Sequence, residues 1–157
     1  MRQYLVVMVC AIVLAACAAP APQSSSVLDD TRAVLQRVCA IDGSPRGSDC
    51  DESPVDPRHA VIEVNPDAER IAAALTCVKD ALPLCGMPVM LKANIDTGDQ
   101  MMTTAGAHAM AGFRAQTDAT LVQNLRKAGV VIVGKTNLSE WAHIRSNDSV
   151  SGWRGLG

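Results

Sequence analysis

One lysine of this sequence stands where its amine could act as a base. Lys92 ends the apolar run 89–91, which has the composition of a buried strand. A buried ammonium is costly unless it is paired or neutral, and burial lowers the pKa of a lysine. A neutral amine here could take the proton of a hydroxyl group and so activate a nucleophile. The alternative is a lysine whose head group reaches solvent at the strand end.

A second lysine lies in a stretch that matches a phosphate-binding loop letter for letter. Residues 129–136, GVVIVGKT, satisfy the pattern G-x-x-x-x-G-K-[ST]. Such a loop follows a strand and needs flexible residues between its glycines. Here a helical pattern precedes Gly129, and the four middle residues are β-branched strand formers. We therefore predict a strand flanked by glycines, a structural role for Lys135, and no bound nucleotide.

The elements that would position these lysines alternate between strands and helices. The expected strands are residues 60–64, 89–91 and 130–133, and the expected helices are 27–40, 65–79, 117–128 and 137–141. Residues 41–59 are rich in Gly, Pro, Ser and Asp and predict a loop. This alternation predicts an α/β fold around an open sheet.

Composition narrows the classes of function. The 157 residues support one domain at most, and the net charge of −2 without a basic block gives no support for a nucleic-acid partner. Aromatic residues are only 3%, which suits a helix-rich α/β layer better than a β-sandwich.

The N-terminus has the pattern of an export signal. Arg2 precedes an apolar stretch over 5–16 that is short for a membrane span. The stretch ends in LAAC, which resembles the lipobox of bacterial lipoproteins, so residues 1–16 are the expected signal peptide and Cys17 the lipidated terminus. Residues 17–26 form a Pro/Ser/Ala-rich tether. We expect a lipid anchor in the cell envelope, on the periplasmic face of the outer membrane; an ordinary signal peptide or a signal anchor is the alternative.

Export changes how the remaining cysteines are interpreted. Four cysteines in an oxidising compartment predict two disulfides, for which three pairings exist. We favour Cys39–Cys50 and Cys77–Cys85, because both pairs close short loops. Zinc is the rival interpretation, but the sequence offers neither C-x-x-C nor paired histidine spacing, so no metal is expected.

Three stretches carry a resemblance to a known family. They are LPLCGMPVMLKANID, TTAGAHAM followed by TDATLVQNLRKAGVVIVGKTNLSEWA, and RSNDSVSGW. Together they resemble the N-terminal part of the amidase signature family, most closely its peptide-amidase branch, over residues 54–153. The resemblance implies an α/β/α layered fold around a mixed sheet, with residues 27–157 as its N-terminal portion.

The resemblance also implies a chemistry. Family enzymes hydrolyse carboxylic amides, including linear amides and C-terminally amidated peptides, through a serine, a second serine on a cis peptide, and a lysine, without a cofactor. By motif position, Lys92 is that lysine. The family's serine-rich G-G-S-S-G-G-like segment follows the S-x-S-G-W run, so neither Ser149 nor Ser151 is expected to be the nucleophile.

Residues 1–157 contain no such serine-rich segment. We therefore expect these residues to be a truncated portion of an amidase domain that is inactive alone. The alternative is a non-catalytic envelope lipoprotein with a binding or structural role.

Overall fold

A computed structural model describes residues 26–43, 45–50, 54, 57–77, 82–144 and 146–153. Its centre is a mixed three-stranded sheet made of β1 (Val61–Val64), β2 (Pro88–Lys92) and β3 (Val131–Thr136). The strand order is β1-β3-β2, with β3 antiparallel to β1 and parallel to β2. The predicted α/β fold around a mixed sheet is confirmed.

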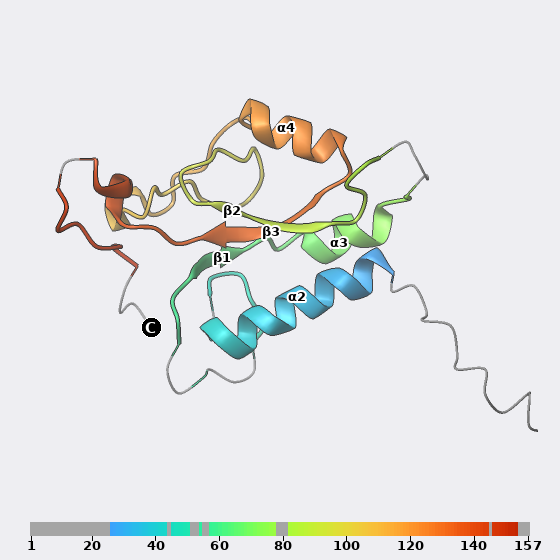
Figure 1. The fold of residues 1–157 in the computed structure, drawn as a ribbon, viewed down its shortest axis with the longest axis horizontal. Coiled ribbons are helices and arrows are strands. Elements are labelled where there is room, and N and C mark those ends of the chain that lie inside the picture. Colours follow the sequence, from blue (N-terminus) through green and yellow to red (C-terminus); the bar gives the residue numbers. More distant parts are fainter. Residues whose placement is uncertain are drawn as a thin grey trace, which may run out of the picture.

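Helices cover both faces of this sheet (Figure 1). The helices α2 (Val27–Asp42) and α3 (Ala68–Ala74) pack together on one face, and α4 (Thr120–Lys127) lies on the other. Successive residues of β3 therefore serve two cores: Val131 and Val133 face α3, whereas Ile132 packs with Val122 of α4. Two short 3-10 helices follow the strands, η1 (His108–Met110) and η2 (Glu140–His143).

Helix α2 begins and ends at residues suited to those positions. The Ser26 hydroxyl accepts the Asp29 N–H at 3.1 Å, and the Asp29 carboxylate accepts the Ser26 N–H at 3.2 Å. This capping box satisfies two of the free donors at the helix start. Gly43, with φ of 77°, ends the helix in a backbone conformation that glycine adopts without strain. The predicted helix over 27–40 is confirmed and runs two residues further.

Two predicted helices start later than expected, and both expected cap residues bind other segments of the chain. The Asn65 side-chain oxygen accepts the Asp67 N–H at 3.0 Å, as expected of a cap, and its nitrogen donates to the Ile132 carbonyl of β3 at 2.8 Å; the regular helix α3 starts at Ala68. Asp118 accepts the Gly98 N–H at 2.7 Å, and α4 starts at Thr120. At Asn65 the capping contact and the tertiary contact therefore occur together, whereas at Asp118 the tertiary contact takes the place of a cap.

The C-terminal part of the sheet region also differs from the prediction. Strand β3 continues past Val133 to Thr136. Gly134 allows this close pairing with β1, because a Cβ atom at that position would lie only 2.8 Å from the Glu63 carbonyl oxygen. The expected helix over 137–141 is instead the 3-10 turn η2, in which Trp141 and Ala142 have left-handed backbone angles. The Asn137 side chain does not cap a helix but donates to the His59 carbonyl at 2.7 Å.

Both predicted disulfides are confirmed. Cys39 and Cys50 are bonded, as are Cys77 and Cys85, with Cα–Cα distances of 5.4 Å and 5.6 Å. The second bridge joins the end of the α3 region to the turn that leads into β2. The predicted signal, the tether up to residue 25 and the lipidated Cys17 lie outside the described residues.

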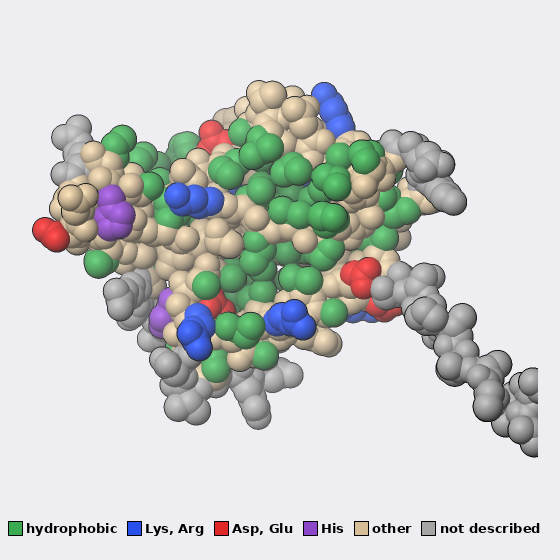
Figure 2. All heavy atoms as spheres, viewed as in Figure 1, with side chains coloured by type: hydrophobic (Ala, Val, Ile, Leu, Met, Phe, Trp, Pro, Cys, Tyr) green, Lys and Arg blue, Asp and Glu red, His purple; other side chains and the backbone are tan. Residues whose placement is uncertain are grey.

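The surface beside β2 is apolar. Figure 2 shows hydrophobic side chains gathered between α2 and α4, over the β2 side of the sheet. Val89 and Met90 are half-buried there, and Met87 is exposed. Within the part of the chain that the structure describes, no helix has the length and apolarity needed to cross a bilayer.

Candidate active site

Lys92 lies at the carboxyl end of β2, the position predicted for it, but its side chain is exposed. The predicted burial of this lysine is therefore wrong for the described structure. The reason is the strand order: β2 has one described neighbour, β3, so only Leu91 of its last residues is fully buried. The apolar run before Lys92 indicated a buried strand without revealing that the strand lies at an edge.

The buried lysine is Lys135, on the central strand. Its side chain is fully enclosed, and its Nζ donates to the Ile95 carbonyl at 2.7 Å and lies 3.4 Å from the Thr103 hydroxyl. Burial lowers the pKa of Lys135, while nearby carboxylates, with Asp99 the strongest, oppose this shift. The GKT stretch thus lies inside a strand whose lysine points into the protein, and it does not form a loop.

The segment that follows Lys92 is held to the sheet by its own backbone. The Ile95 N–H donates to the Lys92 carbonyl at 2.9 Å, which closes a tight turn directly after β2. The Ala93 N–H donates to the Thr136 carbonyl of β3, and the Ala105 N–H donates back to the Ala93 carbonyl, each at 3.0 Å. The end of β2 is therefore flanked by β3 on one side and by the TTAG segment on the other.

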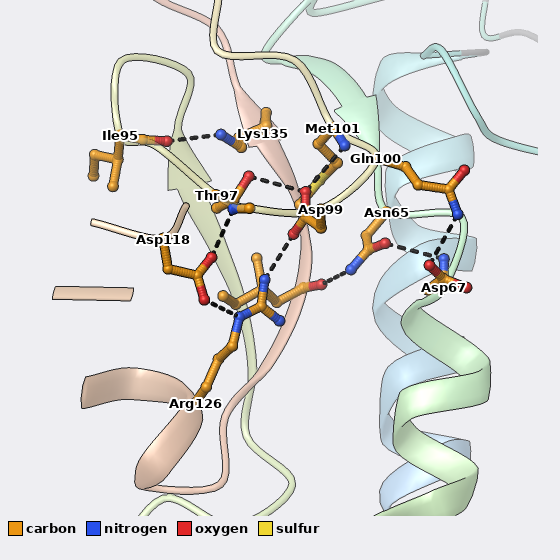
Figure 3. Close-up of polar contacts among 12 residues, drawn as sticks. Asn65, Asp67, Ile95, Thr97, Asp99, Gln100, Met101, Asp118, Arg126 and Lys135 are labelled. Atoms are coloured by element: carbon orange, nitrogen blue, oxygen red, sulfur yellow. Dashed lines mark hydrogen bonds and ion pairs between the residues drawn. The ribbon is translucent and has the colours of Figure 1, made fainter. Parts of the chain in front are cut away.

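A cluster of charged side chains holds residues 97–101, between the end of β2 and the TTAG segment (Figure 3). Arg126 of α4 donates to Asp99 at 2.7 Å and to Asp118 at 2.9 Å. The second oxygen of Asp99 accepts the Thr97 hydroxyl and the Met101 N–H, each at 3.0 Å. One arginine thus links α4 to two points of the segment that precedes it. No sequence signal indicated these contacts, because the partners lie 8 and 27 positions away.

Glu63 of β1 is a second buried charge that reaches the same segment. Its carboxylate accepts the Met102 N–H at 2.7 Å and lies 3.5 Å from the Arg46 guanidinium. Burial raises the pKa of Glu63, and the hydrogen bond from Met102 opposes that shift. The burial of Glu63 was not predicted, because an acidic residue in a short strand indicates an exposed position.

A cleft opens beside the turn after Lys92. Its volume is about 510 Å³, and its lining combines polar groups from the turn with apolar side chains from the segments after it. Asn94, Asp96 and Thr103 form the polar part; Phe113, Trp141 and Ile144 are among the apolar residues. Lys92 itself is not among the lining residues. An apolar cleft with a few convergent polar groups is the usual form of a small-molecule site.

The two serines near the end of the described chain are engaged in local structure. The Ser149 hydroxyl donates to the Glu140 carbonyl at 3.2 Å and lies 3.1 Å from His143 Nδ1. The Ser151 hydroxyl donates to the Asn137 side-chain oxygen at 2.5 Å. Both hydroxyl protons therefore have acceptors in the fold, and the expectation that neither serine is the nucleophile stays a prediction.

No metal site emerges from the described side chains. Among residues 26–153 as far as they are described, no group of three or more His, Cys, Asp or Glu side chains is arranged to hold an ion. His108 instead stacks edge-on against Trp153, with ring centres 5.3 Å apart.

The part of the chain that contains Lys92, the turn after it and the cleft resembles known proteins. Residues 53–152 match the family described as Amidase. The chain belongs to the amidase family. The resemblance inferred over residues 54–153 is thereby confirmed.

Individual relatives agree with this assignment. A relative from Arthroderma benhamiae, itself assigned to the amidases, is 45% identical over 102 residues, which are 62% of this chain and 17% of the relative. An Arabidopsis thaliana relative with the same assignment is 47% identical over 105 residues, or 63% of this chain and 20% of the relative. The peptide amidase of Stenotrophomonas maltophilia has a similar structure, with a TM-score of 0.64 and 42% identity over 82% of this chain and 25% of that one. The chain thus spans a quarter or less of the length of these relatives.

Proposed function

We propose that this chain contributes the lysine base of an amidase that hydrolyses linear carboxylic amides, with C-terminally amidated peptides as the substrate class. The observation that carries the proposal is the match of the Lys92 segment to the amidase family, together with 42% identity to a peptide amidase over most of the chain. Lys92 ends β2, and carboxyl ends of strands in open α/β sheets are where such folds place their sites. No observation favours the alternative of a non-catalytic lipoprotein.

In the proposed reaction Lys92 accepts a proton and the serines carry the covalent step. The neutral amine takes the proton of the bridging serine hydroxyl, which in turn takes the proton of the nucleophilic serine. The nucleophile attacks the amide carbonyl, ammonia leaves with a proton returned along the same path, and water then releases the acid. Residues 1–157 contain no segment resembling the family's serine-rich motif. We therefore propose that the 157 residues alone do not turn over substrate.

The exposure of Lys92 adds a requirement to this proposal. A lysine acts as a base where it is shielded from water, because desolvation disfavours the charged amine. The remaining part of an amidase domain, or the bound substrate, must therefore cover the end of β2. The apolar surface beside β2, where Val89 and Met90 are half-buried, is suited to such a covering layer.

The test measures ammonia release from a C-terminally amidated dipeptide. It uses the 157-residue chain and a polypeptide in which residues 26–157 replace the matching segment of the Stenotrophomonas maltophilia peptide amidase. We expect no release from the chain and release from the chimera that is lost in Lys92→Ala. The control Lys127→Ala, at an exposed lysine ending α4, should keep the activity. Full activity of the Lys92→Ala chimera would overturn the assignment.

We further propose that the chain is exported and anchored in the cell envelope through a lipid on Cys17. This rests on the LAAC motif after an apolar stretch and on the Pro/Ser/Ala-rich tether that follows. In a bacterial host, the wild-type chain should partition into the membrane fraction and incorporate labelled fatty acid, and Cys17→Ser should do neither. Equal partitioning of both proteins would refute the anchor.

A further inference from the structure

Two opposite charges buried on neighbouring strands reach the segment after Lys92. Lys135 on β3 and Glu63 on β1 are register partners, and their side chains are almost wholly enclosed. Neither bonds the other in the structure: Lys135 binds the Ile95 carbonyl, while Glu63 binds the Met102 N–H. The central strand and β1 thus hold this segment at two separate points.

The contact made by Lys135 leads directly to Lys92. The amine donates to the Ile95 carbonyl at 2.7 Å, and the N–H of the same residue donates to the Lys92 carbonyl at 2.9 Å (Figure 3 shows the first of these bonds). Ile95 therefore links the two lysines through its own peptide groups. The Lys135 amine is therefore two hydrogen bonds away from the backbone of the proposed base.

The burial of an amine at this place is costly, which argues for a definite task. Burial lowers the pKa of Lys135, and Asp99, Asp96, Glu63 and Asp118 provide the opposing negative charge. An apolar side chain of the same length would fill the space without the cost of desolvating a charge, but it would leave the Ile95 carbonyl without this donor.

We propose that Lys135 is a positioning residue that holds the Lys92 turn in place through the Ile95 carbonyl. This inference rests on the proposed amidase function, in which Lys92 is the base. Lys135 does not touch substrate; it fixes the backbone of the turn at residues 92–95, so that the end of β2 presents Lys92 in one orientation.

The test uses the 157-residue chain and does not depend on turnover. Lys135→Met matches the four-carbon stem of the lysine and removes the amine that donates, and Lys127→Met at the exposed end of α4 is the matched control. Two site-specific readouts are measured by mass spectrometry. One is amide hydrogen exchange over residues 93–103, and the other is the labelling rate of Lys92 by an amine-reactive reagent, relative to that of an added reference peptide with a single lysine, as a function of pH.

We expect exchange over residues 93–103 to become about tenfold faster in Lys135→Met, while exchange in α2 stays within about twofold of wild type. The pH profile of Lys92 labelling should shift, which a general loss of stability would not produce. Unchanged exchange and labelling in a folded variant would overturn the inference, as would an equal increase in exchange throughout the chain.

A second variant covers the case in which Lys135→Met does not fold. Lys135→Gln keeps a polar donor, but its amide nitrogen lies one bond closer to the backbone and cannot reach the Ile95 carbonyl in the same way. It should show the same local acceleration of exchange, and wild-type exchange would contradict the inference. If Lys92→Ala leaves the chimera active, the amidase assignment fails, whereas the exchange data still decide whether Lys135 holds the turn.

Discussion

Removing the Arg126 side chain should loosen the segment after Lys92 and lower the free energy of unfolding by about 3 kcal/mol. Arg126 is the shared partner of Asp99 and Asp118, at 2.7 Å and 2.9 Å, and the three side chains are only 29%, 13% and 19% exposed. A hydrogen bond between charged groups is worth about 1.5–3 kcal/mol, and a half-buried carboxylate left alone adds a desolvation cost. Two such bonds, reduced because all three side chains remain partly exposed, give the estimate of about 3 kcal/mol.

The assay is urea unfolding of Arg126→Met, followed by far-ultraviolet circular dichroism. With a slope of about 2 kcal/mol/M, the expected loss moves the midpoint down by about 1.5 M. Arg70→Met is the matched control: Arg70 pairs with Asp67 at 3.0 Å, but its side chain is 72% exposed, so its loss should cost about 0.5 kcal/mol or less.

A double-mutant cycle shows whether the effect comes from the pair. Combining Arg126→Met with Asp118→Asn should cost less than the sum of the two single changes, with a coupling energy of about 1 kcal/mol or more. The reasoning is refuted if Arg126→Met costs no more than Arg70→Met, or if the two changes at Arg126 and Asp118 are additive.

Three further predictions concern the frame of the site. Replacing Cys77 and Cys85 by alanine should cost about 2.5 kcal/mol in thermal or urea unfolding, from the loop entropy of a bridge between residues eight positions apart, and a loss below about 0.5 kcal/mol would contradict this. Gly129→Ala should lower the free energy of unfolding by about 2 kcal/mol or more, because φ is 89° and the new Cβ would lie 2.9 Å from Cys85 Cα. Gly112→Ala is the control: Gly112 has the same φ but open space around it, so its loss should be only about 1 kcal/mol. Equal losses for the two variants would argue against the close contact. Burial raises the pKa of Glu63, so above pH 4.5 the folded state holds this proton more tightly than the unfolded chain does. Wild type should therefore lose stability relative to Glu63→Gln as the pH rises from 4.5. A stability difference that does not change with pH would refute this prediction.

Short-range patterns predicted most of the elements. The apolar spacing over 27–40 and the β-branched run over 130–133 each correspond to an observed element, α2 and β3. The two disulfides could also be predicted, because Cys39 and Cys50 on the one hand, and Cys77 and Cys85 on the other, are separated by only 11 and 8 positions. These signals depend on residues close together in the chain.

What the sequence did not reveal depends on contacts between distant residues. Lys92 and Lys135 both follow apolar runs, yet one is exposed on an edge strand and the other is enclosed on the central strand. Strand order decides between these outcomes, and no local pattern encodes it. The same holds for Glu63, whose partner Met102 is 39 positions away.

The predicted start positions of α3 and α4 were wrong for a related reason. Asn65 and Asp118 are good caps by type. Asn65 accepts the Asp67 N–H as a cap does and also binds the Ile132 carbonyl, whereas Asp118 accepts the Gly98 N–H of another segment. A side chain that caps a helix in a peptide can serve the tertiary structure instead, and the helix then begins at the next permissive residue.

The most direct test of the central claim is ammonia release from a C-terminally amidated dipeptide by the chimera that carries residues 26–157. The account predicts turnover with the wild-type segment and with Lys127→Ala, and loss of turnover with Lys92→Ala while the fold is retained. Turnover that survives Lys92→Ala would contradict the assignment of Lys92 as the base.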